Sequence, residues 1–148
     1  MVVSLLRIER VDGDAGLHDW QYVHNLIVPS AALSLDEVRE RSRRYLLEVA
    51  YLDDALVGCT TVRPPTGDPA AATVIARVLP AHRRQGFGGE LWARGLAQAR
   101  ELDPETIETV VWASNADGLR FAQRHGFVEV EEYLLPGDSV PWFTLRLP

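Results

Sequence analysis

The stretch VLPAHRRQGFGGEL, residues 78–91, decides how this sequence is interpreted. An apolar run ends at Leu79, two arginines follow, and three glycines stand within four positions at Gly86, Gly88 and Gly89. Glycine lets a ligand approach the backbone closely, and the free N–H groups at the start of a helix attract anions. The stretch can therefore hold a dinucleotide, a nucleoside triphosphate or a coenzyme A pyrophosphate, or it can be a tight turn without a ligand.

Two of these ligands are excluded by the residues themselves. The dinucleotide fingerprint requires glycine or alanine at its third position, which is Leu91 when counted from Gly86. The phosphate loop of nucleoside triphosphatases requires a lysine, and all 15 basic residues of this chain are arginines. Arginines outnumber acidic residues between positions 77 and 100, although the chain has a net charge of −6. This basic island predicts an anion site at the loop, with a plain turn as the alternative.

Length and composition set the broad class of protein. With 148 residues and 47% hydrophobic side chains, the sequence predicts one globular domain over residues 1–148. The acidic balance argues against nucleic-acid binding through overall charge. No apolar run approaches the ~20 residues of a membrane span, and the N-terminus lacks the basic start of a signal peptide, so we expect a cytoplasmic protein without membrane contact. The single cysteine, Cys59, excludes an intrachain disulfide and a cysteine-based metal cluster, and we expect no metal.

Hydrophobic spacing predicts strands and helices along the whole chain. Ser34 and Glu37 form a capping-box pattern at the start of the second helix. The order β-α-α-β-β-β-α-β-α-β-β mixes hairpins with β-α-β units, which indicates an α/β (α+β) fold with a mixed sheet. The predicted strands cover residues 2–10, 45–51, 55–62, 71–79, 106–113, 127–135 and 140–147. The predicted helices cover 17–28, 34–45, 86–101 and 115–125, and a predicted loop covers 63–69.

A second segment agrees with the glycine loop. NADGLRFAQRHGF, residues 115–127, is similar to the N-x-x-A-x-x-F-Y-x-x-x-G-F block of the GNAT superfamily of N-acetyltransferases. Residues 78–91 resemble the acetyl-CoA motif of the same family, whose core is [QR]-x-x-G-x-[GA]. The resemblance implies a mostly antiparallel sheet of about seven strands, flanked by four helices and splayed between the fourth and fifth strands.

The resemblance also implies where acetyl-CoA, the expected cosubstrate, would bind. In the family the strand before the loop pairs its backbone with the pantetheine arm, the N–H groups of the loop hold the pyrophosphate, and an asparagine contacts the coenzyme. That asparagine can equally be a plain helix cap. The matching positions are Ala76, Arg77 and Val78 on the strand, Arg83, Arg84, Gln85, Gly86, Phe87, Gly88 and Gly89 in the loop, and Asn115 in the second segment.

The side chains that usually transfer protons in this family are missing. The usual tyrosine corresponds to Ala122, which cannot donate a proton, and the strand that often supplies a base offers only Thr73. The catalytic residues are therefore unassigned. His18 and Glu48 are candidates for a base, although Glu48 in such a strand more often faces solvent.

The other singled-out side chains have structural interpretations. His24 is expected to pack on the apolar face of the first helix, His82 to lie near phosphate, and His125 to end the fourth helix. Trp112 is either a wall of the acyl site or part of the core. Cys59 has no partner that would activate it.

These observations predict an acetyl-CoA-dependent N-acetyltransferase that moves an acetyl group to a primary amine by direct attack. The alternative is a non-catalytic acyl-CoA-binding sensor or interaction module, which Ala122 favours. The expected partner is a small-molecule or peptide amine. A homodimer in which the strand over residues 140–147 pairs with its copy is a further hypothesis.

Overall fold

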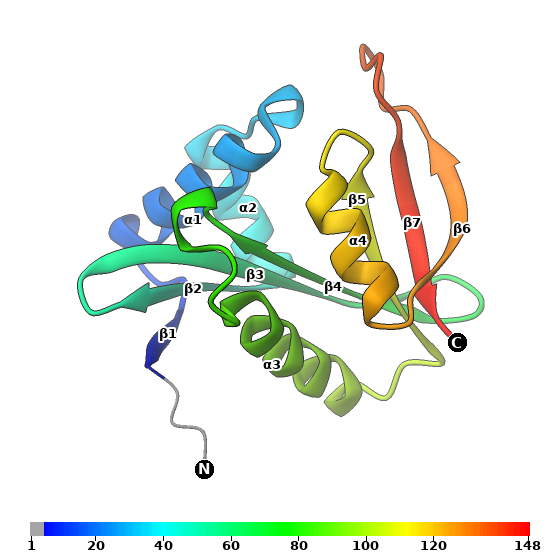
Figure 1. Cartoon of the computed structure of the whole chain (residues 1–148), viewed down its shortest axis with the longest axis horizontal. Coiled ribbons are helices and arrows are strands. Elements are labelled where there is room, and N and C mark those ends of the chain that lie inside the picture. The colour runs from blue at the N-terminus through cyan, green and yellow to red at the C-terminus, as the bar shows by residue number, and fades with distance from the viewer. Residues whose placement is uncertain (1–4) are drawn as a thin grey trace.

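The computed structural model describes residues 5–148 (Figure 1). The predicted order of strands and helices is confirmed, and residues 2–4 of the first predicted strand lie outside the described residues. The strands are β1 (Leu6–Arg10), β2 (Leu46–Leu52), β3 (Ala55–Thr66), β4 (Ala71–Val78), β5 (Thr106–Trp112), β6 (Val128–Tyr133) and β7 (Trp142–Leu147). The helices are α1 (Asp14–Ile27), α2 (Leu35–Arg44), α3 (Phe87–Glu101) and α4 (Ala116–Arg124), with short 3-10 turns η1 (Pro29–Ala31) and η2 (Pro80–His82).

All seven strands form one sheet in the order β1-β2-β3-β4-β5-β7-β6. Every neighbouring pair is antiparallel except β4 and β5, which run parallel. The mixed α+β fold expected from the sequence is confirmed.

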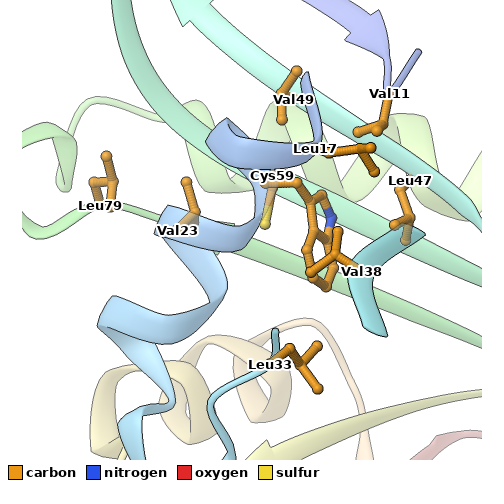
Figure 2. Packing of buried hydrophobic residues seen from close by; sticks show 10 residues of the cluster. Val11, Leu17, Val23, Leu33, Val38, Leu47, Val49, Cys59 and Leu79 are labelled. Carbon is orange, nitrogen blue, oxygen red and sulfur yellow. The ribbon is translucent and has the colours of Figure 1, made fainter. Parts of the chain in front are cut away.

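One hydrophobic core lies between the sheet and helices α1 and α2. Trp20 of α1 is fully buried there, and its Nε1 donates a hydrogen bond to the backbone oxygen of Thr60 at 3.2 Å. Burial of apolar surface, at ~25 cal/mol per Å², holds both helices on this face. Figure 2 shows side chains of this core turned toward one another; its buried members are Val11, Leu17, Trp20, Val23, Leu33, Val38, Leu47, Val49, Cys59 and Leu79.

Helices α3 and α4 cover the opposite face of the sheet with a second core. Alternate residues of a strand point to opposite faces, so Val74 of β4 faces α3 while Ile75 faces the α1 side. Gly95 lets α3 approach closely, because a Cβ there would stand 2.7 Å from Val74 Cγ1. The buried members of this core are Val62, Ala72, Val74, Trp92, Ala99, Ile107, Val111, Ala122, Phe127 and Leu145.

The predicted start of α2 is confirmed in detail. The Ser34 hydroxyl accepts a hydrogen bond from the Glu37 N–H at 3.1 Å, and the Glu37 carboxylate accepts one from the Ser34 N–H at 2.9 Å. This reciprocal pair satisfies two donors that the helix itself leaves free.

The sheet is interrupted at its centre, as expected. Strands β4 and β5 pair only over Ala71–Thr73 and Thr106–Glu108, although β4 continues to Val78 and β5 to Trp112. Beyond these three pairs the two strands diverge, and this opening is called the splay below.

Some predicted boundaries are wrong. The predicted loop over residues 63–69 is too long, because β3 continues to Thr66 and pairs with Ala71. Two prolines occupy this end of β3, and a proline has no N–H for the ladder. The register shift between Arg63 and Thr66 accommodates them, since the ladder is irregular at that point.

The hypothesis of a dimer through the last strand is also wrong in its geometry. Strand β7 pairs with β5 on one side and with β6 on the other, so it has no free edge for a second copy. The edges of the sheet are β1 and β6. No helix within residues 5–148 is long and apolar enough to cross a membrane.

Candidate cofactor-binding site

A cavity of about 420 Å³ occupies the splay. Its lining includes Ile27 and Val28 from the α1 side of the sheet and Trp92 and Phe121 from the α3 side. Because residues of both faces line one cavity, it passes through the sheet where β4 and β5 separate. An extended ligand can enter from one face while a second molecule approaches its end from the other.

The edge of β4 presents free backbone groups to this cavity. The Leu79 N–H donates to the Val57 oxygen at 2.8 Å, so the odd-numbered residues of β4 direct their N–H and C=O groups toward β3. The groups of Val74, Ala76 and Val78 therefore face the splay, where β5 no longer pairs with them. The exception is the Val78 oxygen, which accepts a hydrogen bond from Arg83 Nε at 3.0 Å. The splay can thus accept an added strand-like chain.

The glycine loop forms the start of α3. Gly86 is the residue before the helix and has φ +82°, a left-handed conformation that glycine adopts without strain. No side chain caps this helix, and its first backbone bond runs from Glu90 to Gly86 at 3.2 Å. The N–H groups of Phe87, Gly88 and Gly89 consequently have no acceptor within the helix. Together with the helix dipole they form a seat for an anion.

The shape of this seat depends on missing side chains. A Cβ built at Gly89 would meet no atom within 4 Å, although Gly89 lines the cavity. A Cβ at Gly88 would only touch Phe121 and Val78, at 3.5–3.8 Å. The glycine at position 89 is therefore not required for packing, and the open space above it is a cradle that a side chain would fill. This feature fits a coenzyme A pyrophosphate.

Of the eleven positions predicted to contact the cosubstrate, ten line the cavity. The exception is Gln85, which is exposed and lies outside the lining. Arg83 also approaches α4, with Nη1 at 3.6 Å from Asp117 Oδ2. Arg84 is exposed and has a left-handed φ of 64°. The two arginines therefore differ: Arg83 bonds to β4 and approaches α4, whereas the charge of Arg84 lies in solvent.

Asn115 is a helix cap, as one of its two interpretations held. Its Oδ1 accepts a hydrogen bond from the Gly118 N–H at 3.0 Å. Asn115 also lines the cavity. Because the oxygen is occupied by the cap, the Nδ2 amide is the part of the side chain that remains for a ligand.

Glu48 does not face solvent, and that interpretation is wrong. It is 4% exposed on the α3 face, and Arg94 Nε and Nη2 donate to its carboxylate at 2.8 and 3.0 Å. Gln98 Nε2 adds a third bond at 3.1 Å. Burial alone would raise the pKa of Glu48, but these donors outweigh it and hold the pKa below its ordinary value. The carboxylate is a structural ion-pair partner and is poorly suited to accept a proton.

The expected packing of His24 is confirmed. His24 is buried and stacks on Trp20 with ring centroids 5.2 Å apart, and burial with the nearby charge of Arg77 lowers its pKa to about 4. His82 lines the cavity at the turn before the loop. His18 is exposed on α1 and lines neither this cavity nor the hollow described below.

Ala122 lines the cavity as a buried residue on α4. Phe121 beside it contacts Trp92, with ring centroids 6.1 Å apart. No hydroxyl stands at the position where the family's tyrosine would be. The aromatic residues make this wall of the cavity apolar.

Sequence reasoning did not anticipate most of the wall that closes the splay. Trp142 of β7 lines the cavity and its Nε1 donates to Asp138 Oδ2 at 3.3 Å. Trp112 of β5 is opposite it, and its Nε1 is buried without a partner among the described residues. The sequence had indicated Trp112 as a possible wall, whereas the place of Trp142 depends on the pairing of β5 with β7.

Solved structures share this fold over nearly their whole length. The structure of yncA from Salmonella typhimurium with its cofactor acetyl-CoA has 17% identity and a TM-score of 0.75, covering 97% of this chain and 94% of the other. A Bacillus subtilis acetyltransferase in complex with CoA has 23% identity and a TM-score of 0.69, with 96% and 97% covered. The ribosomal-protein-alanine N-acetyltransferase of Brucella melitensis has 18% identity and a TM-score of 0.73, with 95% and 98% covered.

At these identities the likeness shows a shared fold. A comparison with curated protein sequences gives no match. The model of the acetyltransferase (GNAT) family matches residues 15–127, so the chain belongs to this family.

Proposed function

We propose that this protein is an acetyl-CoA-dependent N-acetyltransferase that moves an acetyl group to a primary amine by direct attack. The observation that carries the proposal is the cavity through the splay, with a seat for an anion on one side of the sheet and an opening on the other. Acetyl-CoA supplies an activated thioester. Solved structures that share the fold of this chain include two that hold acetyl-CoA or CoA.

The chain offers binding groups for the pyrophosphate and for the pantetheine arm of this cosubstrate. The free N–H groups at the start of α3 suit the pyrophosphate, and the exposed charge of Arg84 lies beside them. Backbone groups of Ala76 and Val78 suit the amides of the pantetheine arm, as an added strand. Asn115 Nδ2 can donate to a carbonyl of the same arm.

Acceleration would come mainly from holding the two reactants together. The amine nitrogen attacks the thioester carbonyl, and a β4 N–H that faces the splay and is not paired with the pantetheine arm can stabilise the oxygen that becomes negative. Collapse of that intermediate breaks the carbon–sulfur bond. Because Ala122 replaces the usual acid, water takes the proton from the amine and returns one to the thiolate. The rate should then follow the fraction of unprotonated acceptor amine and show no acidic limb from the protein.

Calorimetry with acetyl-CoA and the release of free coenzyme A across a panel of amines test this function. Micromolar binding with release that depends on the amine would support it. No binding at millimolar acetyl-CoA would refute it.

A second function is favoured by Ala122 and by the apolar wall around it. In this alternative the domain binds an acyl-CoA and acts as a sensor or interaction module without catalysis. Tight binding of acetyl-CoA with no release of coenzyme A above the uncatalysed rate, for all amines tested between pH 6 and pH 9, would favour the alternative over the transferase.

A further inference from the structure

Three half-buried arginines, Arg41, Arg63 and Arg77, have no carboxylate partner in the part of the chain that the structure describes, whereas the other half-buried arginines each have one. Arg39, Arg83 and Arg146 each have an acidic partner at 2.6–3.6 Å. No carboxylate within residues 5–148 lies within 4 Å of Arg41, Arg63 or Arg77. The Arg63 Nε is buried without any hydrogen-bond partner. Charges withdrawn from water without a partner are costly, and an anionic ligand beside these arginines would supply the missing counter-charge.

The three arginines come from different elements and gather on one face of the sheet. Arg63 of β3 pairs with Thr73, and Arg77 of β4 pairs with Cys59, so both side chains point to the face that α1 and α2 cover. Arg41 comes from α2 on that same face. Its charge and that of Arg63 contribute, after burial, to lowering the pKa of Arg77 to about 10. The group is therefore one electrostatic cluster.

The cluster lies along the splay: Arg63 is beside Thr73, the last β4 residue that pairs with β5, and Arg77 is four residues further along the unpaired edge. Arg77 lines the cavity through the sheet, and Arg63 lines an adjoining hollow of about 700 Å³. The two spaces share Val110 in their linings. Arg63 is held in place by Tyr45, with its guanidinium carbon 5.3 Å from the ring centroid.

Acidic side chains in the adjoining hollow do not neutralise the cluster. Glu108 is paired with Arg146, whose Nε and Nη2 donate to it at 3.0 and 2.6 Å. Asp68 and Glu131 are exposed. The hollow therefore holds three carboxylates and two arginines, and none of these carboxylates lies within 4 Å of Arg63 or Arg77.

Building on the proposed transferase function, we propose that the acceptor is a small primary amine that carries an oxyanion, a carboxylate or a phosphonate, which binds between Arg63 and Arg77. The arginines would also favour the neutral form of the nearby amine, since like charges disfavour protonation. The neutral form is the nucleophile. The same cluster thus selects the acceptor and helps to activate it.

Matched product analogues test the charge requirement without depending on turnover. N-acetyl amino acids, their neutral carboxamides and N-acetylaminomethylphosphonate are titrated calorimetrically into the protein saturated with coenzyme A, which keeps the probes out of the phosphate seat. Across the panel we expect acids to bind at least tenfold more tightly than their carboxamides. The phosphonate arm shows which of the two oxyanions is preferred. Equal affinity of acid and carboxamide, or no binding of either, overturns the proposal.

Variants assign the effect to the cluster. Arg63→Met should reduce the acid-to-carboxamide ratio below threefold and leave the affinity for coenzyme A within threefold of the wild type. Arg43→Met, on the exposed face of α2, is the matched control and should keep the full ratio. An undiminished acid-to-carboxamide ratio in Arg63→Met overturns the proposal. If the variant fails to fold, the wild type decides, and the absence of a preference for acids over carboxamides in the wild type overturns the proposal. The probe pairs are also titrated without coenzyme A. If coenzyme A itself fails to bind, that result contradicts the transferase function, and the acid-to-carboxamide ratio measured without coenzyme A still tests the present proposal.

Discussion

Replacing Gly89 by alanine should stabilise the fold and weaken the binding of coenzyme A. Gly89 is the third residue of α3, and a Cβ there would meet no protein atom within 4 Å. Alanine is a better helix residue than glycine, so the free energy of unfolding should rise by up to about 1 kcal/mol. The methyl group would stand in the space proposed for the pyrophosphate.

The expected loss of affinity follows from the bonds at stake. Displacing a phosphate oxygen from one backbone N–H removes a hydrogen bond to a charged group, worth about 1.5–3 kcal/mol. That corresponds to an increase in Kd of roughly 10- to 150-fold. Urea denaturation measures the stability, and calorimetry with coenzyme A measures the affinity.

The control is another glycine in the same helical position. Gly16 is the third residue of α1, away from the cavity, and a Cβ there would lie at 3.4 Å from Val11, an ordinary contact. Gly16→Ala should give a similar gain in stability with unchanged affinity. Acetylpantetheine, which lacks the pyrophosphate, should react equally well with wild type and Gly89→Ala. A Kd within threefold of the wild type in a folded Gly89→Ala protein would refute the assignment of the loop as the phosphate seat.

Three further predictions concern the rest of the molecule. The pKa of His24 is about 4 in the folded protein and about 6.5 when unfolded, so the unfolded chain binds the proton first as pH falls; stability should decrease by about 3 kcal/mol between pH 6.5 and pH 4, and His24→Phe should flatten that slope in urea titrations. Arg94→Met leaves the buried Glu48 carboxylate with an amide donor only, and because Arg94 is half-exposed we expect a loss of about 2–3 kcal/mol at pH 7; the loss should shrink toward pH 4, where Glu48 can protonate. Burial raises the pKa of Cys59 to about 12, so a thiol reagent at pH 8 should label it only after denaturation, and rapid labelling of the native protein would show that this part of the core opens.

Local patterns predicted the fold well because each carries its own physical signal. The alternation of apolar residues located the strands, and the Ser34–Glu37 box located a helix start to the residue. The two motifs placed the cofactor loop and Asn115 on the elements where the structure has them. Such signals depend on neighbours in the sequence, and they do not require knowledge of long-range pairing.

Features that depend on long-range pairing were not predictable. The burial of Glu48 requires Arg94 and Gln98, which approach it only when α3 lies across the sheet. The position of Trp142 in the cavity wall requires β7 to lie beside β5. The lack of acidic partners for Arg63 and Arg77 becomes visible only when β3, β4 and α2 are assembled, because the sequence near each arginine does not show what faces it.

Because β4 and β5 are paired over a short stretch only, a ligand bound between them would become part of the sheet. Only three residue pairs join the backbone of the four-stranded half, β1 to β4, to that of the three-stranded half, β5, β7 and β6. A pantetheine arm along the edge of β4 would add the missing rungs and couple the two halves. Cosubstrate at 100 times its Kd would then contribute about 2.7 kcal/mol to folding. The amide hydrogens of Val74, Ala76 and Val78 would exchange with solvent in the free protein and become protected in the complex. Hydrogen exchange at each of these residues would then show whether the ligand pairs with the sheet at that position.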